Sequence, residues 1–72
     1  MGATIDLAAH NFKETIDKGG TVFIDWWAPW CGPCRAFAPI YENMAQKHDD
    51  ITFAKINTEA QQELAAAFQI QA

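Results

Sequence analysis

The sequence predicts an α/β fold with the order βαβαβα, built around a core sheet of three parallel strands. Segments with strand-like and helix-like hydrophobic periodicity alternate along the 72 residues. Residues 21–28 form a nearly unbroken apolar run rich in aromatic and β-branched side chains, which is typical of a strand buried on both faces. Strands that alternate with helices favour a parallel sheet, so we expect one domain over residues 1–72.

Local signals define the first two elements. Residues 4–7 read as a short strand. Asn11, with Glu14 three residues later, predicts a capping box that opens a helix with Phe12 and Ile16 on its apolar stripe. A Gly-Gly pair ends this helix.

The later elements follow the same logic. Pro33 suits the first turn of a helix over residues 33–47, and Pro39 inside it should produce a kink. Residues 51–57 form the third strand, and residues 58–61 predict a second capping box before the last helix. Helical spacing gives the long helix an inward stripe of Cys34, Phe37, Ala38, Tyr41, Met44 and Ala45.

Composition excludes several classes of protein. The chain is 50% apolar and 19% charged, which is a globular composition, and its net charge of −4 argues against nucleic acid or an anionic membrane surface as a partner. No apolar run approaches the roughly 18 residues that a membrane span requires. The first residues lack the charged and apolar regions of a signal peptide, so we expect a cytoplasmic protein.

The two cysteines, Cys31 and Cys34, lie between the apolar strand and the start of the long helix. A cysteine at a helix N-terminus has a lowered pKa and is more often a nucleophilic thiolate. Cys34, one turn later on the inward stripe, should be less accessible. This spacing also suits a disulfide. We therefore expect Cys31 to attack a substrate disulfide and Cys34 to resolve the mixed disulfide.

Asp25 is an acidic residue inside the apolar run, and by alternation it shares a face with Phe23 and Trp27. A buried carboxylate is costly unless it is protonated, paired or hydrogen-bonded. One interpretation is a buried proton acceptor that helps to deprotonate Cys34. The other is an edge-strand carboxylate that points to solvent.

The stretch DWWAPWCGPCR at residues 25–35, followed by API at residues 38–40, resembles the active-site segment of the thioredoxin family. The resemblance covers residues 7–72, including FAKIN at 53–57 and FQI at 68–70. It implies a thiol–disulfide oxidoreductase that reduces protein disulfides, with no built-in flavin, nucleotide or metal. Electrons would then come from a separate thioredoxin reductase.

The resemblance also implies roles for individual residues. Asp25 would be the buried acid and Lys55 its ionic neighbour. Trp27 and Trp30 would be the aromatic packing around the disulfide, and Pro39 would be the helix kink.

The position of Trp30 beside Cys31 favours a surface contact to partner proteins over packing alone. We expect Gly32 and Pro33 beside it to take part in substrate binding.

Two readings compete with an active enzyme. A lone Cys-x-x-Cys is also half of a zinc site, although the Trp before it and the Gly-Pro within it favour a redox pair. The chain could instead be a non-catalytic fragment or module that keeps the redox pair and works as an assembly unit, or as a metal site shared between chains.

The family continues beyond the matched region into a cis-proline substrate loop, two antiparallel strands and a last helix. We therefore expect the chain to lack this C-terminal ββα portion, which leaves residues 21–28 with residues 51–57 on one side only. An unpaired edge of this kind is a template for pairing with another chain. We accordingly expect a homo-oligomer.

Overall fold

The computed structural model describes residues 3–68, and it confirms the predicted order of elements. The last part of the FQI segment and everything after it lie outside the described residues. The elements are β1 (Ile5–Asp6), α1 (Phe12–Asp17), β2 (Thr21–Trp27), α2 (Gly32–Lys47), β3 (Ile51–Asn57) and α3 (Gln62–Ala67).

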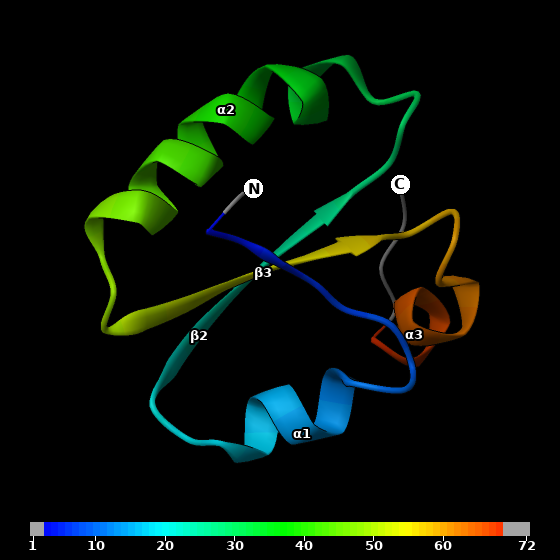
Figure 1. The fold of residues 1–72 in the computed structure, drawn as a ribbon. Coiled ribbons are helices and arrows are strands. Elements are labelled where there is room, and N and C mark those ends of the chain that lie inside the picture. The colour runs from blue at the N-terminus through cyan, green and yellow to red at the C-terminus, as the bar shows by residue number, and fades with distance from the viewer. Residues whose placement is uncertain (1–2, 69–72) are drawn as a thin grey trace.

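The three strands form one parallel sheet in the order β1-β3-β2. Strands β2 and β3 pair along their whole length, with Thr21 opposite Ile51 and Trp27 opposite Asn57. Helix α2 lies on one side of the sheet, and α1 and α3 lie on the other (Figure 1). Both long strands run toward the end of the sheet where the loop into α2 begins, so the cysteines lie at the carboxyl ends of these strands.

The side chains of β3 divide between two apolar clusters, one on each face of the sheet. Toward α2, Phe53 packs with Tyr41 and Ala45, and Phe53 is only 2% exposed. On the opposite face, Ala54 and Ile56 pack with Leu7, and the partly buried residues against this cluster are Phe12, Ile24, Trp26 and Leu64. Because residues two apart on a strand share a face, Asp25, Trp27 and Lys55 belong to the α2 side.

The side chains of strand β2 are more exposed to solvent than the sequence predicts. None of its residues is fully buried, and Phe23 is 44% exposed. The expected burial on both faces is therefore wrong for the described residues. β3 is the inner strand of this sheet, whereas β2 has a strand neighbour on one side only. An apolar run identifies a strand, but it does not distinguish the inner strand from an edge strand.

The first capping box does not form. Asn11 occupies the N-cap of α1, but its Oδ1 accepts the backbone N–H of Ala8, at 2.7 Å, and caps no helical N–H. Thr15 is the buried residue of this short helix, while Ile16 is exposed. The helix does end at the predicted pair, because Gly19 and Gly20 both take positive φ angles, which glycine adopts without strain.

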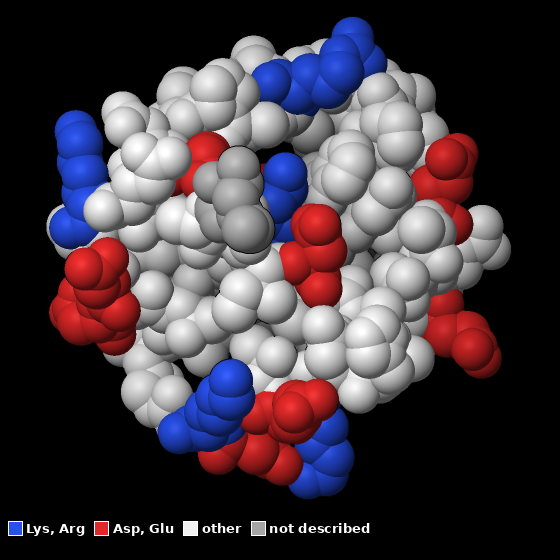
Figure 2. Space-filling model, viewed as in Figure 1, with Lys and Arg blue, Asp and Glu red and all other residues white. Residues whose placement is uncertain are grey.

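Charged side chains are spread around the face shown in Figure 2, with acidic groups lying among the basic ones. Helix α2 is the longest of the described helices, and no helix in residues 3–68 has the length and apolar character needed to cross a membrane.

Candidate active site

The two cysteines are joined across the start of α2. Cys31 is the N-cap residue and has an extended backbone, and Cys34 lies in the first turn. Their sulfurs form a disulfide with a Cα–Cα distance of 5.2 Å, within the predicted range. The Cys31 Sγ also accepts the backbone N–H of Cys34 at 3.2 Å. The sulfur of Cys31 therefore takes the place that a Ser or Asp oxygen usually holds at a helix N-cap.

The loop between β2 and α2 is held by local hydrogen bonds. The buried Ala28 accepts the Cys31 N–H through its carbonyl oxygen at 3.1 Å. The Arg35 side chain donates to the Pro29 carbonyl at 2.7 Å. Pro33 stands in the first turn of α2, where its missing N–H has no helical partner to lose. These contacts fix the backbone on both sides of Cys31.

Asp25 lies on the α2 side of the sheet and is half-buried. Its Oδ2 and the Trp27 Nε1 are the two buried side-chain polar atoms that lack a hydrogen-bond partner within the described part of the chain. Burial raises the pKa of Asp25 above its ordinary value, and the positive charge of Lys55 opposes this rise. Asp25 is therefore a partly desolvated carboxylate, and its role as a proton acceptor stays a prediction.

Lys55 is the cross-strand partner of Asp25 on β3, so both side chains leave the same face of the sheet. Its ammonium group lies over the Trp27 ring, 5.1 Å from the ring centroid, which is cation–π geometry. Among residues 3–68 the one side-chain ion pair is between Lys13 and Asp17. Lys55 thus acts on Asp25 at longer range than a direct salt bridge.

Tyr41 has a polar role that its place on the inward stripe does not reveal. Its hydroxyl lies 3.0 Å from the Phe23 carbonyl oxygen and 2.8 Å from the Ala54 carbonyl oxygen, so it can donate to either strand. Burial, with a further contribution from the charge of Asp25, raises the pKa of Tyr41 to about 12. Tyr41 therefore stays protonated and ties α2 to the sheet close to Asp25.

Thr58 is a second residue whose role differs from the prediction. Its N–H and its hydroxyl both donate to the Trp27 carbonyl oxygen, at 2.8 Å and 3.1 Å. The second capping box is therefore wrong, and α3 begins at Gln62 with Gln61 as its N-cap. The turn between β3 and α3 is instead held by Asn57, whose Oδ1 accepts the N–H groups of Glu59 and Ala60.

The three residues expected to contact substrate are exposed to solvent. Trp30 is 56% exposed, and Gly32 and Pro33 beside it are exposed too. Pro39 lies inside α2, which continues past it to Lys47. Contact of Trp30 with substrate proteins stays a prediction.

The family model described as Thioredoxin matches residues 3–72. The chain belongs to the thioredoxin family. It is 49% identical over 70 residues to a protein of Streptomyces coelicolor assigned as thioredoxin 2, covering 97% of this chain and 52% of that one. It is 42% identical over 69 residues to a thioredoxin of Alicyclobacillus acidocaldarius, covering 94% and 66% of the two chains.

Solved thioredoxin structures share the fold. The Fasciola hepatica thioredoxin superposes with a TM-score of 0.89 at 33% identity, covering 96% of this chain and 69% of that chain. The Malassezia sympodialis thioredoxin gives 0.81 at 31% identity, covering 100% and 65%. The chain spans about half of the length of the Streptomyces coelicolor relative and about two thirds of the Alicyclobacillus acidocaldarius thioredoxin.

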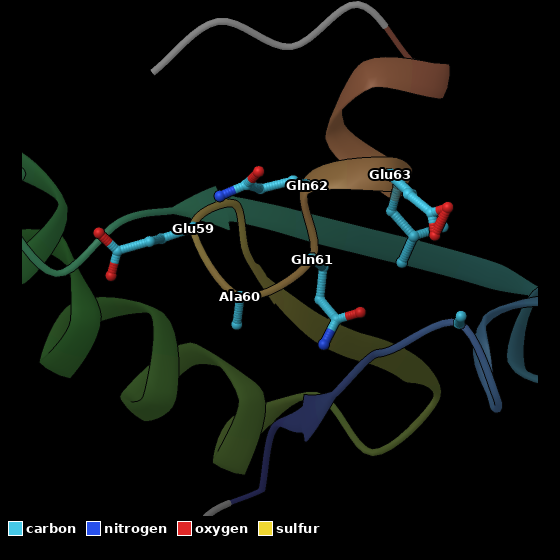
Figure 3. Close-up of a pocket in the computed structure, with 7 residues that line it drawn as sticks. Glu59, Ala60, Gln61, Gln62 and Glu63 are labelled. Carbon is cyan, nitrogen blue, oxygen red and sulfur yellow. The ribbon is translucent and has the colours of Figure 1, made fainter.

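A pocket of about 290 Å³ lies at the turn before α3, and neither cysteine lines it. Its two carboxylates, Glu59 and Glu63, point away from one another on opposite sides of the turn (Figure 3). They therefore form no acid–base pair. No group of three or more His, Cys, Asp or Glu side chains within residues 3–68 is arranged to hold a metal ion.

Asp25→Asn should stabilise the protein at pH 7 by on the order of 1 kcal/mol, because it removes a poorly solvated carboxylate. A carboxyl with a raised folded-state pKa binds more protons when folded, so wild-type stability falls as the pH rises from the unfolded value of 3.8 through the folded pKa. The advantage of the variant should grow over this window and vanish below it.

Urea unfolding at several pH values measures this difference. Asp50→Asn, which removes an exposed carboxylate in the turn before β3, is the matched control and should give a nearly constant difference. An Asp25→Asn effect that is independent of pH, or a loss of stability at pH 7, would show that Asp25 is not a strained buried acid.

Proposed function

We propose that this thioredoxin-family chain reduces disulfide bonds in proteins by thiol–disulfide exchange at Cys31 and Cys34. The observation that carries the proposal is the disulfide across the first turn of α2, with the Cys31 Sγ accepting a backbone N–H. This N–H and the helix dipole would stabilise a thiolate on Cys31 once the disulfide is reduced.

The reaction has two exchange steps. The Cys31 thiolate attacks one sulfur of the substrate disulfide, which forms a mixed disulfide and releases the other substrate sulfur as a thiolate. Cys34 then gives its proton to Asp25 and attacks the Cys31 Sγ, forming the Cys31–Cys34 disulfide and releasing the second substrate thiolate. Two electrons pass to the substrate, and its two thiolates are protonated.

Asp25 is the proton acceptor of the second step in this proposal, and Lys55 is its charged neighbour. The half-buried position of Asp25 on the α2 side and its unpartnered Oδ2 support this role. A raised carboxyl pKa brings proton affinity closer to that of a thiol, which makes transfer from Cys34 less costly.

Substrate proteins would contact Trp30, Gly32 and Pro33, which are exposed beside the disulfide. Trp27 would support the site from the sheet through its contact with Lys55. Pro39 would retain the structural role that the resemblance implies, as the kink of α2.

A thioredoxin reductase is the proposed electron donor. One relative, 35% identical over 71 residues, is the bifunctional thioredoxin reductase/thioredoxin of Mycobacterium leprae, and this chain covers 16% of it. Both activities are thus named for a single polypeptide in that organism. The cytoplasm, where such a pair meets a reducing environment, stays our prediction for the location.

Reduction of insulin by dithiothreitol, followed by turbidity, tests the function. The wild-type chain should accelerate the reaction, while Cys31→Ser should be inactive and Cys34→Ser should accumulate a mixed disulfide on Cys31. Asp25→Asn should keep the first step and slow the second, and Asp50→Asn should match the wild type. A wild-type rate no faster than that of Cys31→Ser would refute the proposal.

The alternative hypothesis is an assembly module, of which we retain self-association as a proposal. Within the described residues, β2 pairs with β3 alone, so its other edge presents free backbone N–H and C=O groups. Phe23 on this strand is exposed, as are Phe37, Ile40 and Met44 on α2. We propose that copies of the chain associate through this edge.

Nothing favours a metal ion shared between chains, because the two cysteine sulfurs are bonded to each other.

Light scattering behind a sizing column, with reductant present and over a range of concentrations, tests this association. The average mass should rise above 8.0 kDa as concentration increases. Phe23→Lys places a charge on the edge and should lower the mass, since edge lysines block strand pairing. A wild-type species of constant 8.0 kDa at every concentration would rule the association out.

A further inference from the structure

Three charged residues stand in one row across the sheet. Asp6 on β1 is the register partner of Lys55 on β3, and Lys55 is the register partner of Asp25 on β2. Register partners on parallel strands are about 4.8 Å apart and project to the same face. The single lysine therefore has a carboxylate on each side.

Lys55 forms no direct ion pair with either carboxylate in the described part of the chain. Its ammonium group lies over the Trp27 ring, and the ion pairs of residues 3–68 do not include it. Lys55, Trp27 and Asp6 also line a common pocket of about 350 Å³, together with His10 from the loop after β1. In the register of the sheet Lys55 thus stands between two acidic residues, Asp25 half-buried and Asp6 exposed.

We propose that Asp6 is a positioning residue that shares the charge of Lys55 with Asp25 and so controls how readily Asp25 takes the proton of Cys34. The proposal rests on the proposed function only for its kinetic consequence. The coupling among Asp6, Lys55 and Asp25 is a property of the folded chain, with or without substrate.

The direction of the effect follows from the groups that face Asp25. Lys55 faces it from β3, Tyr41 approaches it from α2, the cysteine pair lies at the start of α2, and Asp6 stands beyond Lys55. A negative Asp6 repels the Asp25 carboxylate and attracts the Lys55 ammonium group toward β1. Both effects favour protonated Asp25, so Asp6 acts against the lowering of the Asp25 pKa by Lys55.

Carbon-13 NMR titration of the Asp25 carboxyl in the oxidised protein measures the coupling directly. Asp6→Asn should lower the midpoint by about 0.2 to 0.7 pH unit, the range expected for partly exposed charges. Asp50→Asn, with the same change in net charge at the opposite end of β3, should move it by less than about 0.1 pH unit.

Two further measurements decide whether Lys55 carries the effect. In a Lys55→Gln background, Asp6→Asn should shift the Asp25 midpoint by less than half as much. Salt should also reduce the difference between wild type and Asp6→Asn, because exposed charges are screened. An unshifted midpoint in Asp6→Asn, or an equal shift with and without Lys55, overturns the proposal.

The kinetic consequence is measured in single-turnover reactions. The second step requires ionised Asp25, so the acidic limb of its pH–rate profile should move to lower pH in Asp6→Asn by the same amount as the NMR midpoint. An NMR shift without a matching kinetic shift would refute the control of proton transfer. An inactive protein that still shows the NMR shift would instead refute the proposed function and leave the coupling intact.

Discussion

The parallel pairing of β2 with β3 determines the position of nearly every group in the site. Their register sets Asp25 beside Lys55 and Phe23 beside Phe53, and it ends both strands at the same edge of the sheet. The hydroxyl of Tyr41 spans the pair from α2, and Thr58 holds the last carbonyl of β2. Tyr41 thus ties α2 to the middle of the pair, and Thr58 fixes the end of β2 from which the backbone leads into Cys31.

The same arrangement places charge where an apolar residue would be more stable. Asp25 and Lys55 occupy the face that Phe53 and Tyr41 otherwise fill with aromatic rings. One carboxylate oxygen and the indole nitrogen of Trp27 are buried without partners among the described residues. A carboxyl group with a raised pKa is a candidate functional group, because such burial costs stability without any gain in packing.

Sequence patterns were sufficient for the order of elements and for the dithiol. The cysteine pair could be placed because a Pro after Cys31 and the apolar strand before it both mark a strand-to-helix junction. Simple alternation could place Asp25 on the same face as Phe23 and Trp27, but it could not show that this is the α2 side. Only the family resemblance could identify Lys55 as the neighbour of Asp25. Their pairing depends on a strand register that local periodicity does not specify.

Other features depended on contacts between distant segments. Asn11 and Thr58 both have the residue type of a helix cap, yet Asn11 bonds back to Ala8 and Thr58 bonds across to Trp27. The long-range bond of Thr58 has no local signature. Likewise, the run at residues 21–28 has the composition of an inner strand, although the inner position in the described sheet belongs to β3.

The central claim is that the start of α2 makes Cys31 the attacking thiolate and leaves Cys34 as the resolving thiol. Brief alkylation of the reduced protein with iodoacetamide, followed by peptide mapping over a range of pH, tests it most directly. We expect Cys31 to be labelled at least about tenfold faster near neutral pH and to react with a lower apparent pKa than Cys34. Equal labelling of the two cysteines at every pH would contradict the account.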